Sequence, residues 1–198
     1  MIKAVIFDIG GTIVDWTDYI IWRYVARKYH VNYSYAKKKL DYLSTFRELG
    51  SLEEKKMWKI FFESVNIPLP KDYKFLMSEK FEKLAKLNIG VIRLIKRLGK
   101  GGYKLGVISN IESTHERIVK KRGWLKYFDV VVLSNKVRIR KPSKEIYKIA
   151  LKRLKVKPSE AIFIDNLKEN VVGAKRVGIK SIWFKNATQL ERKMKSCL

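Results

Sequence analysis

The sequence predicts an α/β fold, with a parallel five-stranded sheet flanked by helices and a small all-helical domain inserted after the first strand. Three observations lead to this prediction. Short apolar runs rich in Val and Ile recur along the chain, helical patterns separate them, and the first of these connections is much longer than the others. Strands buried on both faces appear as continuous apolar runs, and strands that alternate with helices are typical of parallel sheets.

Five apolar runs are the expected strands, because each is short and rich in β-branched or aromatic residues. In chain order they are Ala4 to Phe7, Leu105 to Ile108, Val130 to Leu133, Ala161 to Ile164 and Ser181 to Phe184. Between them, apolar residues from Val91 to Leu98, and again from Ile146 to Leu154, recur three or four positions apart. This spacing predicts helices with one apolar face, which could cover the sheet.

The connection between the first and second strands is too long for a single crossover. Its content is helical, with one apolar face from Trp22 to Tyr29 and another from Met57 to Val65. We therefore expect a helical domain at residues 15–87 and a core domain formed by residues 1–14 and 88–198.

The chain is strongly basic, with 44 Lys and Arg against 19 Asp and Glu and a formal net charge of +25. Such an excess attracts anions. The basic residues are spread along the chain as KKK, EEKK, KRLGK and KKR, and they form no concentrated arm or zinc-finger spacing. The sequence therefore favours small anionic substrates as partners, and it does not predict specific nucleic-acid binding.

Targeting and cysteine patterns favour a cytoplasmic protein without a membrane partner. No run approaches the roughly 20 uncharged apolar residues of a membrane span, and the N-terminus lacks the pattern of a signal peptide. The single cysteine, Cys197, excludes an internal disulfide and a thiolate metal cluster. His30 and His115 have no partners at metal-ligand spacing, so we expect them to be ordinary residues on a helix surface or partly buried.

Polar residues follow the expected strands at the points where the strands end. They are Asp8 in VIFDIGGT, Ser109 and Asn110 in VISN, Lys141 in RKP, and Asp165 and Asn166 in FIDN. The carboxyl ends of parallel strands meet at one edge of the sheet, where open α/β sheets bind ligands. We therefore expect carboxylates, a hydroxyl and a lysine to converge there.

This set of side chains suits phosphoryl transfer. A carboxylate fixed at a strand end can attack phosphorus, which divides a difficult hydrolysis into two displacements. The Ser109 hydroxyl, together with free backbone N–H groups at a helix start near Asn110, suits phosphate oxygens. Lys141 can neutralise the charge on the transferring group, and oxygen ligands from another strand end can hold Mg²⁺.

With these motifs, the sequence resembles the haloacid dehalogenase superfamily of hydrolases, in the branch with an α-helical cap inserted into a Rossmann-like core. The motifs VIFDIGGT, VISN, RKP and FIDNLKENVVGAKRVGI extend over nearly the whole chain. The roles that the resemblance implies are nucleophile for Asp8, phosphate binding for Ser109, Asn110 and Lys141, Mg²⁺ binding for Asp8, Gly10 and Asn166, and support for Thr12, Asp165 and Asn170.

Two positions depart from the pattern of the family. Gly10 stands where its phosphatases usually carry a second aspartate, the general acid and base, although glycine keeps the backbone carbonyl that binds Mg²⁺ in the family. Asn166 stands where the family usually has a metal-binding aspartate. Because asparagine lacks the negative charge, we expect weak Mg²⁺ binding, and Asp165 could either compensate or orient Lys141.

Three functions are compatible with these departures. The first is a Mg²⁺-dependent small-molecule phosphatase, favouring good leaving groups such as the carboxylate of an acyl phosphate, whose conjugate acid has a pKa of about 4. The second is a metal-free 2-haloacid dehalogenase, which needs a cap arginine, for which Arg47 is the candidate. The third is a non-catalytic relative that binds a phosphorylated ligand or a protein.

Overall fold

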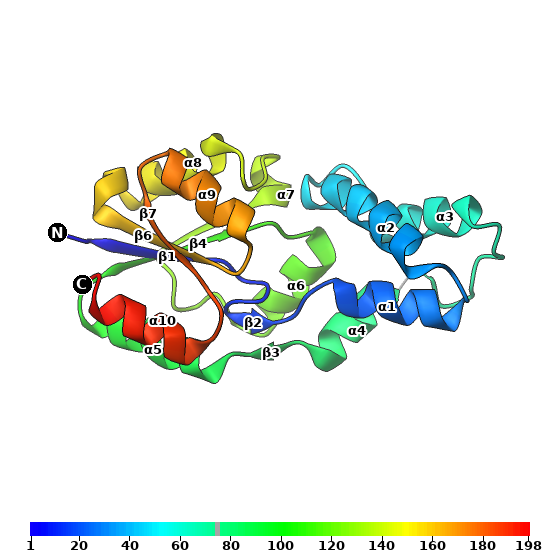
Figure 1. Ribbon diagram of the computed structural model, residues 1–198, viewed down its shortest axis with the longest axis horizontal. Helices are drawn as coiled ribbons and strands as arrows, with labels where there is room; N and C mark the ends of the chain where they lie inside the picture. The colour runs from blue at the N-terminus through cyan, green and yellow to red at the C-terminus, as the bar shows by residue number, and fades with distance from the viewer. Residues whose placement is uncertain (74–75) are drawn as a thin grey trace.

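The computed structural model of the chain describes residues 1–73 and 76–198, and it has a sheet-based core at one end and a helical cap at the other (Figure 1). Its strands are β1 (Ala4–Phe7), β2 (Val14–Asp15), β3 (Lys86–Leu87), β4 (Lys104–Ser109), β5 (Val130–Leu133), β6 (Ala161–Asp165) and β7 (Lys180–Trp183). Its helices are α1 (Tyr19–Lys28), α2 (Tyr33–Glu48), α3 (Glu54–Ser64), α4 (Leu76–Leu84), α5 (Ile89–Lys100), α6 (Ser113–Lys121), α7 (Ser134–Val137), α8 (Lys144–Leu154), α9 (Lys168–Arg176) and α10 (Ala187–Lys195).

The core contains a five-stranded parallel sheet with strand order β5-β4-β1-β6-β7, which confirms the predicted fold class. All five predicted strands are present, with ends that differ by at most one residue from those expected. Strand β1 lies at the centre, so Phe7 pairs with Val107 of β4 on one side and Ile164 of β6 on the other. The residues that follow these three strands therefore meet at one edge.

Helices cover both faces of the sheet, as the apolar stripes predict. Helices α8 and α9 lie on one face, and α5 and α10 lie on the other (Figure 1). Alternate residues of β1 face opposite sides, because side chains alternate along a strand. Ala4 and Ile6 belong to the apolar cluster under α8, and Val5 and Phe7 belong to the cluster that includes α5.

The cap consists of α1, α2, α3 and α4, and its interior is aromatic. Trp22 of α1 and Trp58, Phe61 and Phe62 of α3 are buried, with the Trp22 and Trp58 ring centroids 6.3 Å apart. These aromatic residues pack as core, as the sequence predicts. Within the described residues, no helix is long and apolar enough to cross a membrane.

A short antiparallel ribbon connects the cap to the core. Strand β2 pairs with β3, with Val14 opposite Leu87, so the chain leaves the core and returns to it side by side. Two-residue strands are too short to produce an alternation that the sequence could reveal. A second connection lies at the far end of α2, where the Ser134 hydroxyl donates to the backbone oxygen of Glu48 at 2.6 Å.

Candidate active site

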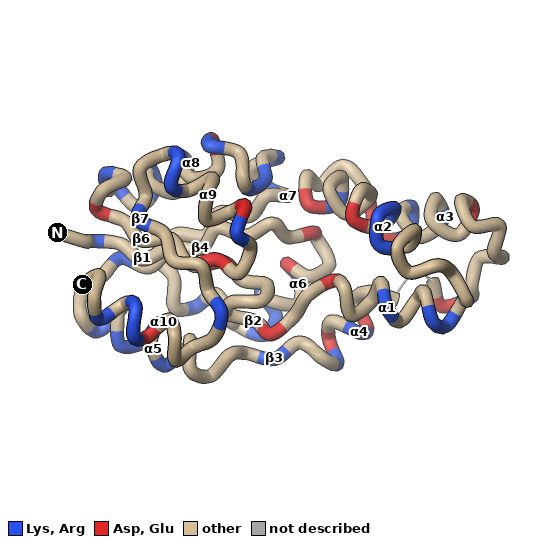
Figure 2. The backbone as a smooth tube through the Cα atoms, in the orientation of Figure 1, with Lys and Arg blue, Asp and Glu red and all other residues tan. Residues whose placement is uncertain are grey.

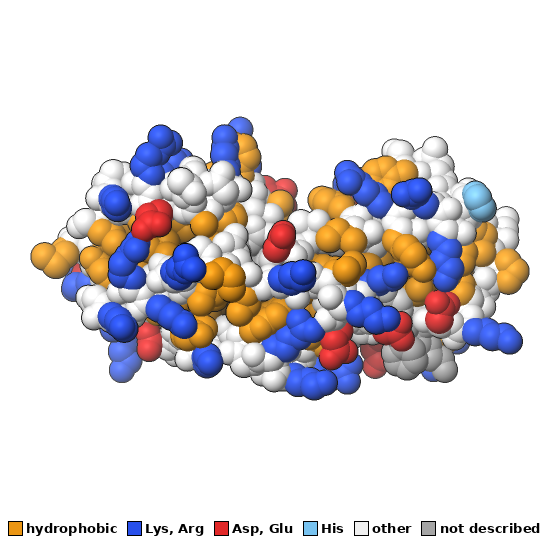
Figure 3. Space-filling view, turned by 90° about the horizontal axis from the view of Figure 1, so that it is seen from below, with side chains coloured by type: hydrophobic (Ala, Val, Ile, Leu, Met, Phe, Trp, Pro, Cys, Tyr) orange, Lys and Arg blue, Asp and Glu red, His pale blue; other side chains and the backbone are white. Residues whose placement is uncertain are grey.

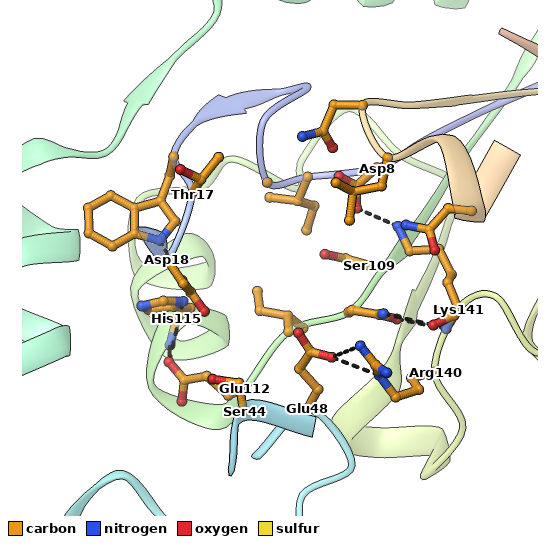
Figure 4. A pocket seen from close by; sticks show the side chains of 18 of the residues that line it. Asp8, Thr17, Asp18, Ser44, Glu48, Ser109, Glu112, His115, Arg140 and Lys141 are labelled. Atoms are coloured by element: carbon orange, nitrogen blue, oxygen red, sulfur yellow. Dashed lines mark hydrogen bonds and ion pairs between the residues drawn. The ribbon is translucent and has the colours of Figure 1, made fainter. Parts of the chain in front are cut away.

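A cavity of about 450 Å³ lies between the cap and the carboxyl ends of β1, β4 and β6 (Figure 4). Its core side is lined by residues that the sequence predicts for the site, which are Asp8, Gly10, Ser109, Asn110, Lys141, Asn166 and Asn170. Its cap side is lined by Thr17, Asp18, Tyr19, Trp22, Asp41, Ser44, Thr45, Glu48 and Phe81. The convergence expected from the strand ends is therefore present in the structure.

Two residues of the cavity floor, Asp8 and Lys141, belong to a buried arrangement of two carboxylates and one ammonium, and Asp165 lies behind them. Lys141 Nζ donates to Asp8 Oδ1 at 2.5 Å, to Asp165 Oδ2 at 2.7 Å and to the backbone oxygen of Ile108 at 2.9 Å. The exposed fractions of the three charged residues are 6% for Asp8, 1% for Lys141 and 0% for Asp165. All three protons of the ammonium are thus in use.

Burial and the neighbouring charges shift the pKa values of Asp8 and Lys141. Burial raises the pKa of the Asp8 carboxyl to about 7, against the lowering effect of the Lys141 ammonium, and Asp165 adds to the rise. Burial alone would lower the pKa of Lys141, but its two carboxylate partners hold it above the usual range. Lys141 is therefore cationic at neutral pH, and Asp8 can exist there as carboxylate or carboxylic acid.

Asparagine side chains hold this charged set in place. Asn110 Nδ2 donates to the backbone oxygen of Lys141 at 3.0 Å, and Lys141 N–H donates to Asn110 Oδ1 at 2.8 Å. Asn170 Nδ2 donates to both oxygens of Asp165 at 3.1 and 3.0 Å, and Leu167 N–H donates to Asp165 at 2.7 Å. Asp165 thus contacts Lys141, which was one of the two alternatives for it, and the Asn110 side chain is engaged with the Lys141 backbone.

The segment after β4 differs from the expectation of free N–H groups at a helix start near Asn110. Helix α6 begins at Ser113, and the Glu112 carboxylate caps it by accepting from Thr114 N–H at 2.7 Å and His115 N–H at 2.8 Å. A carboxylate satisfies the donors that an anion would otherwise use. That expectation was wrong. The Ile111 N–H also donates to the Ser134 hydroxyl at 3.0 Å, so the Ser109 hydroxyl is the donor that this segment offers to a phosphate.

The turn after Asp8 is built from two glycines in different conformations. Gly11 has a φ of +71°, which favours glycine, and a Cβ there would displace the Asn166 amide. Gly10 lies outside the left-handed region and lines the cavity, and a Cβ there would meet only the backbone oxygen of Trp16. Thr12 is buried, and its N–H donates to the backbone oxygen of Ile9 at 3.3 Å, which closes the turn.

The residues proposed for Mg²⁺ form a set of oxygen donors with little charge. Among the residues described, no group of three His, Cys, Asp or Glu could hold a metal ion. The remaining donors are the Asp8 carboxylate, the Gly10 carbonyl and the Asn166 amide, whose side chain packs against the glycine turn. Hard oxygen donors fit Mg²⁺, which also keeps several waters. The set contains one carboxylate, that of Asp8, which also accepts from Lys141, so we expect it to bind Mg²⁺ weakly.

Glu48 and Arg140 form a pair that the sequence did not reveal. Arg140 Nε and Nη2 each lie 2.8 Å from Glu48 Oε2, which joins the end of the cap helix α2 to the segment before Lys141. Both side chains line the cavity (Figure 4). The two residues are 92 positions apart, so no local pattern indicated the contact.

Arg47, the arginine considered for a dehalogenase, is used inside the protein. It is 2% exposed, its Nη2 lies 2.8 Å from Glu112 Oε2 and 4.0 Å from Glu54 Oε2, and its Nη1 contacts Met77 Sδ. It does not belong to the cavity lining. An arginine committed to a buried ion pair is a poor candidate for binding a substrate carboxylate.

His115, which we expected on a helix surface or partly buried, is buried and lies in the cavity wall. It is 6% exposed, and its ring stacks on Phe81 with centroids 3.9 Å apart. Its Nδ1 lies 3.4 Å from Glu112 Oε1. The packing on Phe81 explains its burial, and the position next to the cavity could not be read from an isolated histidine in the sequence.

A parallel α/β core with a buried aspartate and lysine at its strand ends, covered by a helical cap, defines a class of capped hydrolases. Residues 5–184 match the haloacid dehalogenase-like hydrolase family, and the chain belongs to this family. The resemblance seen in the motifs is thereby confirmed.

Relatives within this family include named phosphatases. The chain is 30% identical over 188 residues to phosphorylated carbohydrates phosphatase from Thermotoga maritima, covering 91% of this chain and 84% of that protein. It is 29% identical over 199 residues to glyceraldehyde 3-phosphate phosphatase from Pyrococcus abyssi, covering 93% and 82%. These names favour a phosphatase over a dehalogenase.

The fold also matches a solved structure that contains ligands. A haloacid dehalogenase family enzyme from Bacteroides thetaiotaomicron, in complex with magnesium and inorganic phosphate, has a TM-score of 0.72 and 19% identity, covering 94% of this chain and 96% of that chain. At this identity, the likeness supports the shared fold.

Proposed function

We propose that the protein is a Mg²⁺-dependent phosphatase that hydrolyses small phosphorylated molecules through an aspartyl-phosphate on Asp8. The observation that carries the proposal is the buried Asp8 carboxylate, held at 2.5 Å from Lys141 on the floor of the cavity. The phosphatase names of two relatives that cover most of their length support it.

In the first step, an oxygen of Asp8 forms a bond to phosphorus while the bond from phosphorus to the leaving oxygen breaks. Lys141 balances the negative charge of the transferring group, and Ser109 is the hydroxyl within reach of its oxygens. In the second step, water attacks the phosphorus of the aspartyl-phosphate, which releases inorganic phosphate and restores the Asp8 carboxylate.

Asp8, the Gly10 carbonyl and Asn166 would hold Mg²⁺ in this proposal. When bound, Mg²⁺ supplies positive charge that stabilises negative oxygens during the transfer. A neighbour of the same fold is solved with magnesium and inorganic phosphate, which supports the choice of metal. The single carboxylate in the donor set motivates the expectation of weak binding.

The chain lacks the usual proton donor for the leaving group. Gly10 has no side chain to donate a proton, so leaving groups that are stable as anions should react best. Acyl phosphates belong to this class. Alkyl phosphates require a proton from a group of the cavity wall or from water.

A substrate panel with and without Mg²⁺ tests the proposal. We expect metal-dependent phosphate release from acetyl phosphate, an aryl phosphate and sugar phosphates, and its loss in Asp8→Asn. Glu63→Gln, an exposed change on the cap helix α3, is the matched control. Metal-independent halide release from 2-chloropropionate would instead support a dehalogenase. Stabilisation by phosphorylated ligands without any turnover would support the non-catalytic alternative.

A further inference from the structure

The cavity is lined by more acidic than basic side chains, although the chain as a whole is strongly basic. Lys and Arg are spread over the core and the cap, and several acidic residues lie where the two meet (Figure 2, Figure 3). The acidic residues that line the cavity are Asp8, Asp18, Asp41, Glu48, Glu112 and Glu169, and the lysines and arginines are Arg140 and Lys141. Four of these acids have a cationic partner: Asp8 pairs with Lys141, Asp41 with Lys37, Glu48 with Arg140 and Glu112 with Arg47. Among the described residues, Asp18 and Glu169 line the cavity without such a partner.

Both cations of the cavity wall are already paired. Lys141 donates to two carboxylates, Asp8 and Asp165. Arg140 directs two nitrogens at Glu48, each at 2.8 Å, and the two side chains are 34% and 20% exposed. Among the described residues that line the cavity, neither basic side chain is therefore free for a second anionic group of a substrate.

The cap side of the cavity adds a carboxylate that has no cationic partner in the described part of the chain. Asp18 Oδ1 accepts from Trp16 Nε1 at 2.9 Å, and no ion pair among the described residues includes Asp18. Burial raises the pKa of Glu48 against the lowering effect of Arg140, and Asp18 adds to the rise. The Asp18 and Glu48 carboxylates therefore repel each other, and a third anion between them would be repelled by both.

We propose that, among phosphate monoesters, the site selects those whose leaving alcohol is uncharged and carries hydroxyl groups, and that it excludes those with a second anionic group. This inference rests on the proposed phosphatase function. Hydroxyl groups can donate to Asp18 across the cavity from Asp8, Ser109 and Lys141 (Figure 4). A second carboxylate or phosphate would have to compete with Glu48 for Arg140 and leave a half-buried acid unpaired.

A matched substrate pair tests the inference. Glycerol 3-phosphate and 3-phosphoglycerate differ mainly by a neutral hydroxymethyl group in one and a carboxylate in the other. We expect kcat/KM to favour glycerol 3-phosphate by about tenfold or more, because like charges in a partly buried site repel strongly. An equal kcat/KM for both, or a preference for 3-phosphoglycerate, would overturn the inference.

Glu48→Gln gives the experiment a second arm. Glutamine keeps the shape of the side chain and releases the Arg140 charge, so we expect the preference to fall by about tenfold. Glu63→Gln removes one acid from the exposed surface of α3 and should leave the preference unchanged. A preference that is unaltered in Glu48→Gln would show that this pair does not select the substrate.

Binding to the Asp8→Asn variant separates this inference from the proposed catalysis. Thermal shifts of that variant with the same two compounds should show stronger stabilisation by glycerol 3-phosphate. If neither compound is hydrolysed by the unaltered protein but the binding preference is present, the proposed catalysis fails and the charge selection stands. Equal or stronger stabilisation by 3-phosphoglycerate would overturn the charge selection, whatever the rates.

Discussion

Gly10→Asp is the substitution that should change the chemistry of the site most directly. A Cβ at Gly10 would meet only the backbone oxygen of Trp16, at the ordinary contact distance of 3.6 Å, and the backbone there needs no left-handed conformation. Gly10 lines the same cavity as Asp8, so a carboxyl at this position is added next to the nucleophile. The substitution therefore tests proton transfer with little disturbance of the turn.

The expected gain follows from the basicity of the leaving group. General-acid catalysis contributes about 100- to 10,000-fold, which is about 3 to 5 kcal/mol of activation free energy. An alkoxide needs this proton, whereas the carboxylate leaving group of acetyl phosphate, with a conjugate-acid pKa of about 4, does not. We expect kcat for glycerol 3-phosphate to rise at least about 100-fold and kcat for acetyl phosphate to change by less than about threefold.

The assay compares phosphate release from both substrates by the unaltered protein, Gly10→Asp and Gly10→Asn at saturating Mg²⁺. Asparagine has the shape of aspartate but cannot donate a carboxyl proton, so it controls for effects on the turn. Equal gains for the two substrates, or an equal gain in Gly10→Asn, would refute the reasoning. Either result would mean that residue 10 acts through metal binding or loop shape.

Three further predictions follow from the buried groups. Lys141→Met leaves Asp8 and Asp165 facing each other without a counterion, so phosphatase activity should be lost and urea unfolding should show a free energy lower by about 3 to 5 kcal/mol. Unchanged stability would contradict the buried pairing. Mg²⁺ needs the Asp8 carboxylate, whose pKa is raised to about 7, so its apparent affinity should be constant above this pH and fall about tenfold per unit below it. Calorimetry in buffers of different ionisation enthalpy should detect proton release near pH 7, and its absence would refute the assignment. Gly11→Ala forces a Cβ to within 2.3 Å of Asn166, so thermal unfolding should show a loss of about 1 to 3 kcal/mol and Mg²⁺ titration a weaker affinity, whereas normal values for both would mean that the turn relaxes freely.

Much of the core was predictable because its signals are local. Each buried strand is a short apolar run, and parallel pairing brings the strand ends together, so Asp8, Ser109 and Lys141 could be assigned to one edge before any coordinates were known. The resemblance to the family then supplied the roles. The structure adds the distances that connect these residues, including the three contacts of the Lys141 ammonium.

The contacts between cap and core could not be predicted in the same way. The pair of Glu48 and Arg140, and the pair of Arg47 and Glu112, each join distant positions of the chain, and charged residues are common throughout it. The sequence alone therefore does not indicate which acidic residue each arginine contacts. The same difficulty hid the Glu112 cap of α6, because a glutamate before a helix does not by itself indicate that it replaces an anion.

Exposed charges and charges inside the cavity affect substrate binding differently, and the composition shows only the total charge. Exposed Lys and Arg raise the local concentration of any anion, but salt screens their field within about 8 Å and they discriminate poorly between one anionic group and two. Discrimination requires contact inside the cavity, where Arg140 is paired with Glu48 and Asp18 faces the substrate space. The net charge of +25 favours an anionic substrate, and in the selection that we propose Asp18 and Glu48 of the cap limit how many negative charges that substrate carries.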